Sequence, residues 1–252
     1  MQDGRRRVVS NTDTLWNTLF DNMKLIFFLL PFVVLLNAAE LNAVEPESLF
    51  DGRATDGWVE VTGKPISPTS WTIDDGCLRT VITSGAGAQD IRTTAVYHNF
   101  DFEFDWKVLA NGNSGVKYLI QRIDEWTNQL GRQARARGLE YQIADNNGPD
   151  AVEPIRSAAS LYSAIAPQPP TNPAIGQFHH GRIVVKDDHV EHWLDGVRVV
   201  SFDLNQPEVK KVIADNRKKE EQKKAPLRDT AISLQNHGTL CWFKNLKIRR
   251  LE

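Results

Sequence analysis

Hydrophobic and polar residues alternate along several stretches of this chain. Residues 100–108 read FDFEFDWKV, so aromatic residues fall on one side of an extended chain and charged residues on the other. A period of two predicts a β-strand with one buried face and one polar face. Similar patterns predict strands over residues 116–121, 139–143, 182–186, 190–194, 197–202, 232–235 and 240–249. Asp195-Gly196, between two of these strands, is typical of a two-residue hairpin turn.

Regularly spaced strands with turn signals between them are typical of a sandwich or jelly roll. We therefore expect an all-β protein, built as an antiparallel β-sandwich of the jelly-roll type. Residues 208–224 interrupt the strand pattern, because they are rich in charge and poor in β-formers, and they predict a short surface helix. Residues 149–176 contain six prolines and predict a long loop, which in a compact domain is usually functional or disordered.

The N-terminal region has the layout of a secretory signal peptide. Residues 25–36 are apolar apart from one proline, they follow Lys24, and small residues come after them. This run is about a dozen residues long, whereas a transmembrane helix needs about 20. We expect residues 1–43 to be an N-terminal extension and signal peptide, and residues 44–252 to form the β-sandwich domain. The mature protein is then expected to be periplasmic or extracellular, without a stable membrane span. A short membrane anchor is the alternative.

Composition narrows the classes of partner. The formal net charge is -2, and residues 208–224 carry charges of both signs, so we expect no nucleic-acid binding. The seven tryptophans can be core residues or flat surfaces for sugar rings. The two cysteines, Cys77 and Cys241, are too few for a disulfide framework or a CxxC metal site, and they leave open one disulfide or two buried thiols.

Side chains that form hydrogen bonds occur within several of the predicted strands. Strands that are distant in sequence can be neighbours in a sandwich, so their polar faces could form one concave surface. Amides are depleted in strands, and they suit sugar hydroxyl groups because they both donate and accept hydrogen bonds. We therefore predict a carbohydrate site whose substrate contacts are Asn113, Gln142, Tyr162, Gln235 and Lys244.

Charged residues in and near the same segments have two interpretations each. Glu140, Asp145, Lys117 and His237 either belong to the site or are ordinary solvent-facing and turn-capping residues. A smaller basic loop contains Arg132, Arg135 and Arg137. We expect it to be either a solvated turn or a contact for an anionic substrate at the rim of the site.

Short motifs occur in a fixed order along most of the chain. They are Leu49-Phe50-Asp51-Gly52 with Gly57-Trp58, Asn113-Ser114-Gly115, Glu140-Tyr141-Gln142 with Asp145, Leu161-Tyr162 with Ala166-Pro167, Leu234-Gln235-Asn236-His237-Gly238 and Lys244-Asn245-Leu246-Lys247-Ile248. Their order and spacing resemble the 3-keto-disaccharide hydrolase family, which has the concanavalin A-like lectin/glucanase fold. The chain departs from the family pattern at Asn236, where the family has Asp, at Lys244, where it has Arg, and near residues 178–180, where it has Trp-Asn.

The resemblance implies an enzyme that cleaves glycosides already oxidised at C3. A ketone at C3 acidifies the proton on C2, a base removes that proton, and the C1 leaving group departs by β-elimination, after which water adds. Glu140 or His237 would be the base, and Lys117, Lys244 or a metal ion would stabilise the enediolate oxygen. Glu140, Asp145 and His237 offer two carboxylates and an imidazole, so they could hold one divalent metal ion. No other cofactor is expected.

Two other functions remain open from the sequence. Glu140, Gln142 and Asp145 copy the spacing of the Glu-x-Asp-x-x-Glu motif of retaining glucanases. A retaining pair needs carboxyl groups about 5–5.5 Å apart, and five residues along a strand reverse the face unless a bulge intervenes. The second alternative is a carbohydrate-binding module without catalysis, because fold alone does not determine activity.

Overall fold

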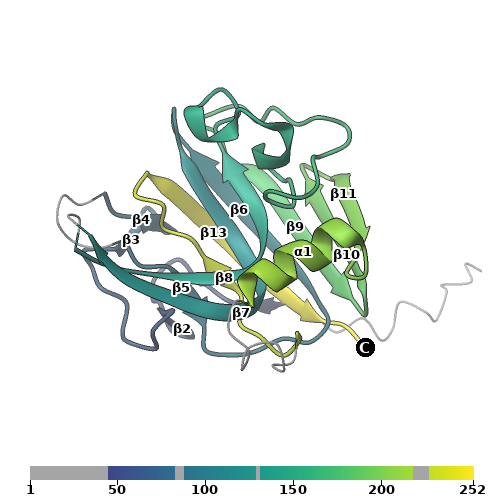
Figure 1. The fold of residues 1–252 in the computed structure, drawn as a ribbon. Coiled ribbons are helices and arrows are strands. Elements are labelled where there is room, and N and C mark those ends of the chain that lie inside the picture. The colour runs from purple at the N-terminus through teal and green to yellow at the C-terminus, as the bar shows by residue number, and fades with distance from the viewer. Residues whose placement is uncertain (1–44, 83–87, 129–130, 218–226) are drawn as a thin grey trace, which may run out of the picture. The chain divides into compact units, whose positions relative to one another are not determined.

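Two β-sheets make up most of the computed structural model, which describes residues 45–82, 88–128, 131–217 and 227–252 (Figure 1). The larger sheet contains β1 (Glu47–Ser48), β3 (Trp71–Asp74), β4 (Cys77–Thr80), β6 (Phe100–Val108), β9 (His179–Lys186), β10 (His189–Leu194), β11 (Val197–Asp203) and β13 (Cys241–Arg250). The smaller sheet contains β2 (Trp58–Glu60), β5 (Ile91–Thr93), β7 (Asn113–Asn128), β8 (Gly131–Ala144) and β12 (Ser233–Leu234). The helices are α1 (Pro207–Asn216) and the 3₁₀ turns η2 (Pro149–Ala151) and η3 (Pro154–Arg156).

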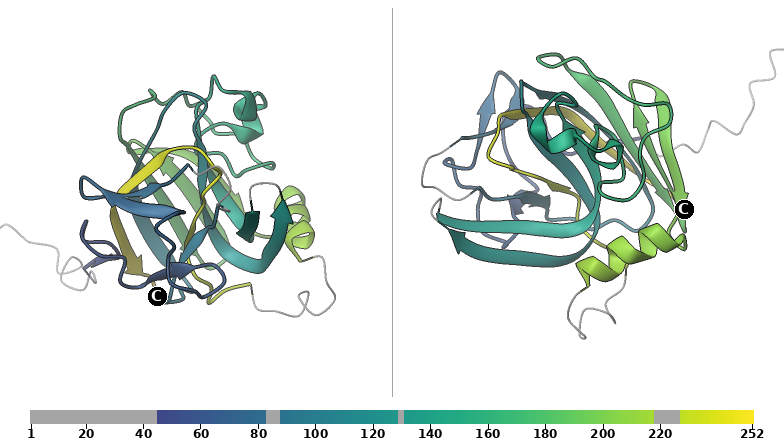
Figure 2. Two further views of the ribbon diagram at one scale, coloured as in Figure 1. Left: turned by 90° about the vertical axis from the view of Figure 1, so that its left-hand side faces the viewer. Right: turned by 45° about the horizontal axis from the view of Figure 1, so that its top comes forward.

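The strand order brings together segments that are far apart in sequence. In the described part of the chain, the larger sheet has the order β11-β10-β9-β6-β13-β4-β3, and β1 pairs with β13. The smaller sheet has the order β2-β5-β12-β7-β8. The strands within each sheet pair in antiparallel fashion. The two sheets lie against each other (Figure 2), which confirms the predicted antiparallel β-sandwich.

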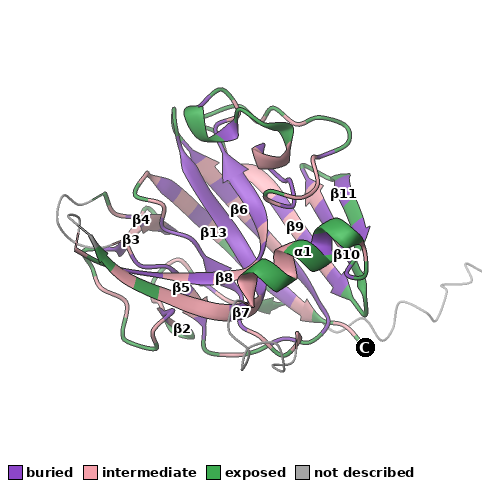
Figure 3. Cartoon of the chain, in the orientation of Figure 1, coloured by how far each residue is buried: buried purple, intermediate pink, exposed green. Residues whose placement is uncertain are grey.

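The alternation that predicts β6 is the alternation observed. Phe100, Phe102, Phe104 and Trp106 are at most 1% exposed, and Phe104 packs edge-on against Tyr141 of β8 with 5.2 Å between the ring centroids. Buried positions run along the central strands of the larger sheet (Figure 3). Burying one such side chain contributes about 1.5–3 kcal/mol. These aromatic side chains therefore form part of the hydrophobic core between the sheets.

A buried histidine in β10 links the core to the proline-rich loop. His192 is fully buried, and burial lowers its pKa to about 4, so the imidazole is neutral. Its Nδ1 lies 3.0 Å from the carbonyl oxygen of Ala159, and its Nε2 lies 2.7 Å from the hydroxyl oxygen of Tyr118. A carbonyl oxygen only accepts, so Nδ1 donates to Ala159 and the Tyr118 hydroxyl donates to Nε2. These bonds connect β7, β10 and the loop that follows β8.

The same loop covers the outer edge of β8. The backbone amides of Ala159 and Tyr162 donate to the carbonyl oxygens of Gln142 and Glu140, at 2.8 and 3.0 Å. An edge strand without such cover would expose a row of unpaired backbone groups. Because the loop pairs with β8, it places Tyr162 beside Glu140.

The observed strands differ from the predicted ones in two respects. The alternation does not predict the short strands β1 to β5, because two to four residues are too few to show a period. β7 and β8 extend beyond the predicted strands and form one long hairpin, so Arg132, Arg135 and Arg137 lie on β8 and not in a basic loop. A cross-strand ion pair between Arg132 and Glu125, and a contact of Arg135 with the ring of Trp126, help to hold this extension.

The remaining predictions concern a hairpin turn, a surface helix and the N-terminal segment. Asp195-Gly196 joins β10 to β11 with φ values of 49° and 81°, which confirms the predicted hairpin, since this turn needs left-handed backbone. α1 confirms a helix in the predicted region but ends at Asn216, and residues 218–226 lie outside the described residues. The predicted signal peptide, residues 1–43, also lies outside them.

In the part of the chain that the structure describes, no helix has both the length and the apolar character that crossing a membrane requires.

Cys77 and Cys241 are both buried, and both are free thiols. Of the two arrangements left open by the sequence, the structure therefore shows buried thiols.

Candidate functional site

The face of the smaller sheet that points away from the core carries a row of polar residues. Val116 and Tyr118 of β7 point into the core, so Lys117 between them points to the opposite face. Glu140 of β8 pairs with Lys117 on one side, and Ser233 of β12 pairs with it on the other. Polar residues from three neighbouring strands therefore meet on this face.

Gly115 marks the next position of the row, two residues before Lys117. It pairs with Gln142 of β8, and its carbonyl oxygen accepts a hydrogen bond of 2.9 Å from the backbone amide of Gln235. Asn113 lies at the start of the same strand, and its Oδ1 is 3.4 Å from Nε2 of Gln142. The structure thus brings five of the sequence-predicted site residues to one face: Asn113, Lys117, Glu140, Gln142 and Gln235.

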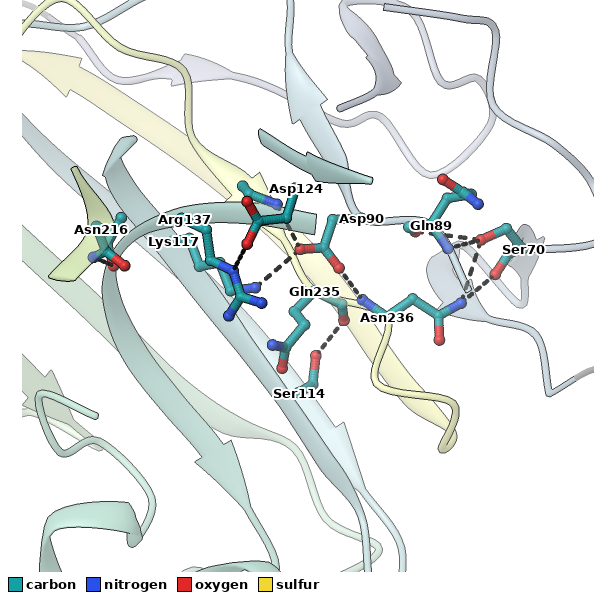
Figure 4. A network of polar contacts seen from close by, with 12 residues as sticks. Ser70, Gln89, Asp90, Ser114, Lys117, Asp124, Arg137, Asn216, Gln235 and Asn236 are labelled. Atoms are coloured by element: carbon teal, nitrogen blue, oxygen red, sulfur yellow. Dashed lines mark hydrogen bonds and ion pairs between the residues drawn. The ribbon is translucent and has the colours of Figure 1, made fainter. Parts of the chain in front are cut away.

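A buried carboxylate that the sequence does not reveal holds Lys117 in place. Asp90 precedes β5 and is 0% exposed, and its Oδ2 lies 2.9 Å from Nζ of Lys117 (Figure 4). The backbone amides of Ala136 and Asn236 donate to the same carboxylate, each at 3.1 Å. Buried charges are tolerated when they are paired and hydrogen-bonded. Asp90 therefore fixes the position of the Lys117 side chain.

Burial raises the pKa of the Glu140 carboxyl, and the Lys117 ammonium opposes that rise. Asp90 raises the pKa further, whereas Arg135 and Arg137 lower it. A carboxylate with a raised pKa is a stronger base than an exposed one, and the neighbouring cations favour its ionised form. Glu140 is therefore suited to remove a proton from a bound molecule.

The Glu140 side chain leans across Gly115. A methyl group at position 115 would lie 3.0 Å from Cδ of Glu140 and still closer to its Oε1. We predict that Gly115→Ala displaces the carboxyl group and lowers kcat by about 10²-fold, because a misplacement of about 1 Å has an effect of this size. The melting temperature should change little, since the displaced atoms end a flexible side chain. An unchanged kcat in a folded Gly115→Ala variant would show that the position of this carboxyl group is unimportant.

His237 follows β12 and lies in the same electrostatic surroundings. Burial lowers its pKa, and the cations of Arg135 and Lys117 lower it further, so the imidazole is neutral at neutral pH. Arg135, Lys117 and Asp90 act on the pKa of both Glu140 and His237. Both ionisable groups therefore belong to one cluster of charges.

A cavity of about 200 Å³ opens beside Glu140 and Lys117. Its walls come from β8, the loop after β8, and α1, and they include Arg137, Gly138, Tyr162, Val212 and Asn216. The Asn216 side chain donates to the carbonyl oxygen of Gly138 at 2.8 Å, which ties the end of α1 to β8. The cavity thus combines a carboxylate, an ammonium group and a tyrosine, and polar and apolar groups line it in similar measure.

Lys244 does not lie on this face. It belongs to β13 of the larger sheet, where its neighbour Phe243 is buried in the core and Lys244 points outward. Its Nζ lies 4.0 Å from the centroid of the Phe178 ring. The outer faces of two packed sheets point in opposite directions, so the structure does not bring Lys244 together with Lys117 and Glu140.

Asp145 supports a turn at the end of β8. Its two carboxylate oxygens accept from the backbone amides of Asn111 and Asn147, both at 2.9 Å. Within the described ranges, no three His, Cys, Asp or Glu residues are grouped so that they could hold a metal ion. The structure therefore does not assemble Glu140, Asp145 and His237 as a ligand set, and we derive no step through a metal ion. Asp145, the second carboxylate of the glucanase-like spacing, is held in this turn.

Comparison with family models assigns the chain to a known group. The model of the 3-keto-alpha-glucoside-1,2-lyase-like domain matches residues 45–249. The chain belongs to this family. Among curated relatives, it is similar to the 3-keto-disaccharide hydrolase of Bacteroides thetaiotaomicron, with 29% identity over 86% of this chain and 84% of the relative. The resemblance drawn from the sequence motifs is thereby confirmed.

Solved structures agree with the family assignment. A protein of Parabacteroides distasonis ATCC 8503, described as a glycosyl hydrolase of inferred function, has 27% identity and a TM-score of 0.63, covering 81% of this chain and 93% of that chain. A second protein from the same organism has 22% identity and a TM-score of 0.61, covering 82% and 100%, and it supports the fold alone. The family therefore rests on the sequence match, and the solved structures support the fold.

Proposed function

We propose that this chain is a carbohydrate-active enzyme that cleaves glycosides oxidised at C3. The observation that carries the proposal is the position of Glu140, whose carboxyl pKa is raised by burial and which faces Lys117 beside a cavity lined by Tyr162. The reaction requires a base for a carbon-bound proton and a cation for the oxyanion that forms. The names of the family and of its Bacteroides relative both refer to 3-keto sugars, which supports this substrate class.

In the proposed reaction, Glu140 removes the proton from C2 of the sugar. The electrons of the C2–H bond form a C2=C3 double bond, and the C3 ketone oxygen becomes an enediolate oxygen. The Lys117 ammonium, held by Asp90, stabilises this negative charge. The enediolate then reforms the ketone, a C1=C2 double bond forms, and the C1–oxygen bond breaks to release the aglycone alkoxide, which takes up a proton. Addition of water across C1=C2 gives the free 3-keto sugar.

The substrate assay separates this proposal from its alternatives. The purified protein should release the aglycone from a 3-keto-glycoside and should not release it from the same glycoside with an ordinary C3 hydroxyl. Cleavage of the unoxidised glycoside would instead support a glucanase-like activity. Binding of both sugars without cleavage would support a carbohydrate-binding module and would overturn the proposal.

The pH dependence of kcat/KM should reflect Glu140. The base acts when deprotonated, so activity should be present above the Glu140 pKa and lost as the pH falls through it. Because burial raises that pKa, the acidic limb should lie above the ordinary glutamate value of about 4.3. Since the pKa of His237 is lowered, no limb from a free histidine near about 6.5 is expected. A rate profile from about pH 4 to about pH 9 tests this, and an acidic limb at or below about 4.3 would contradict it.

Tyr162 should contribute to binding more than to chemistry. Its backbone is fixed beside Glu140, and its side chain lines the cavity, where a sugar ring can pack against the aromatic ring. Tyr162→Ala should raise KM by about two- to tenfold, which corresponds to roughly 0.5–1.5 kcal/mol of aromatic contact, and leave kcat nearly unchanged. Tyr162→Phe is the matched control and should retain the wild-type KM. An alanine variant with unchanged KM would remove Tyr162 from the binding site.

A further inference from the structure

Three buried side-chain oxygens on the outer face of the smaller sheet have no hydrogen-bond partner among the described residues. They are Oε1 of Gln142, Oε1 of Gln235 and Oγ of Ser233, on side chains of residues that are 1%, 6% and 0% exposed. A buried polar group without a partner costs about 1–3 kcal/mol. All three residues pair with Gly115 or Lys117 in the centre of the candidate site. Such a concentration of unpaired acceptors indicates a place for groups that donate hydrogen bonds.

A chain of hydrogen bonds determines which end of the Gln142 amide is free. Nδ2 of Asn113 lies 2.7 Å from Oδ2 of Asp150, and an ionised carboxylate only accepts, so Asn113 must present its NH₂ group to Asp150. Its Oδ1 is then turned toward Gln142, 3.4 Å from Nε2. Gln142 must therefore present its own NH₂ group to Asn113, which leaves Oε1 as the unpartnered end.

Asp150 is the first residue of this chain of hydrogen bonds, which we call the relay. It lies in η2, in the loop that follows β8. The turn formed by Asp145 lies at the start of this loop. Asp150 itself is exposed, whereas Asn113 and Gln142 are 6% and 1% exposed. Either amide could rotate by half a turn without a change of shape, so among the described residues the acceptor at position 150 sets their direction.

We propose that Asp150 is a positioning residue that makes the Gln142 subsite an acceptor for sugar hydroxyl groups. Gln235, on the other side of Gly115, carries a second unpartnered amide oxygen. This inference rests on the proposed function, because it assumes that a sugar occupies this face. The subsite then favours a ring that carries a free hydroxyl at the contacted position, and it disfavours a ring in which fluorine or an O-methyl group replaces that hydroxyl, because neither can donate.

The test measures binding in the Glu140→Gln background, so that the ligand is not consumed. The ligands are methyl 3-keto-glucopyranoside and its deoxyfluoro analogues at C4 and at C6, titrated by NMR. With Asp150 present, one analogue should bind about 5- to 100-fold more weakly than the parent sugar, since one buried acceptor is left unpaired. Asp150→Asn lets both amides reverse, because an amide at position 150 can donate to Asn113. The ratio of the affinity for the parent sugar to the affinity for that analogue should then fall toward one. Asp150→Glu, which keeps the carboxylate, should restore the ratio.

Each outcome decides the inference. A ratio that is the same with Asp150 and with Asp150→Asn overturns the positioning role, and a parent sugar that binds no better than either analogue overturns the acceptor subsite. Absence of binding by every ligand also overturns it. Turnover of a 3-keto-glycoside by the unsubstituted protein is measured in parallel. Turnover with an unaffected ratio rejects only the relay, whereas a ratio that depends on Asp150 without turnover rejects only the proposed reaction.

Discussion

Replacing Glu140 by glutamine should lower the turnover of a 3-keto-glycoside by about 10²–10⁴-fold, the usual contribution of a general base. Glutamine has the same shape and can still form hydrogen bonds, but it cannot take up the C2 proton. The variant should fold, because Glu140 borders a cavity and is not part of the hydrophobic core. Steady-state kcat, with circular dichroism and melting temperature as checks on folding, measures the effect.

His237→Asn is the matched control for Glu140→Gln, because His237 shares the same charged surroundings. If Glu140 is the base, the histidine variant should retain more activity than the glutamine variant, and its acidic limb should stay in place. A Glu140→Gln variant with nearly full turnover, together with an inactive His237→Asn variant, would transfer the role of base to His237.

Removing the carboxylate of Asp90 should destabilise the fold by about 3–5 kcal/mol, as expected when one partner of a buried ion pair is lost. Asp90→Ala leaves the ammonium of Lys117 buried without its partner, and it also deprives the backbone amides of Ala136 and Asn236 of their acceptor. Both effects act on the strands that carry the site. Chemical denaturation measures the loss as a change in the free energy of unfolding.

Two comparisons make this stability prediction specific. Lys211→Met removes a cation from an exposed ion pair in α1, with the lysine side chain 77% exposed, and should change stability by at most about 1 kcal/mol. The double variant Asp90→Ala with Lys117→Met should recover part of the stability lost in Asp90→Ala, because it removes the unpaired charge. If Asp90→Ala costs no more than Lys211→Met, the pair is not structurally important.

The sequence predicts the parts of the fold that have a local signal. The alternation of residues 100–108 predicts β6 with its correct bounds, and the Asp195-Gly196 pair predicts the turn between β10 and β11. The length of the β7–β8 hairpin has no such signal, because pairs across the two strands, such as that of Arg132 with Glu125, hold its outer half. Contacts across strands depend on register, which composition does not reveal.

The candidate site shows the same division between local and tertiary information. Lys117, Glu140 and Gln142 were accessible to prediction because each occupies a polar position in a strand whose other face is apolar. Asp90 was not, since its importance comes from three donors on β7, β8 and the segment after β12. Lys244 lies apart from these residues, because a polar position in a strand does not tell which of the two sheets the strand joins.

In the proposed reaction, cleavage proceeds by removal of the proton at C2. Its most direct test is the cleavage of a 3-keto-glycoside that carries deuterium at C2, in ordinary water, with mass or NMR analysis of the first-formed product. Product incubated without the protein serves as the control for spontaneous exchange. We expect deuterium to leave C2 during cleavage, because Glu140 removes it and exchanges it with water. Full retention of deuterium at C2 in the product would rule out proton removal there, since a direct displacement at C1 never breaks the C2–hydrogen bond.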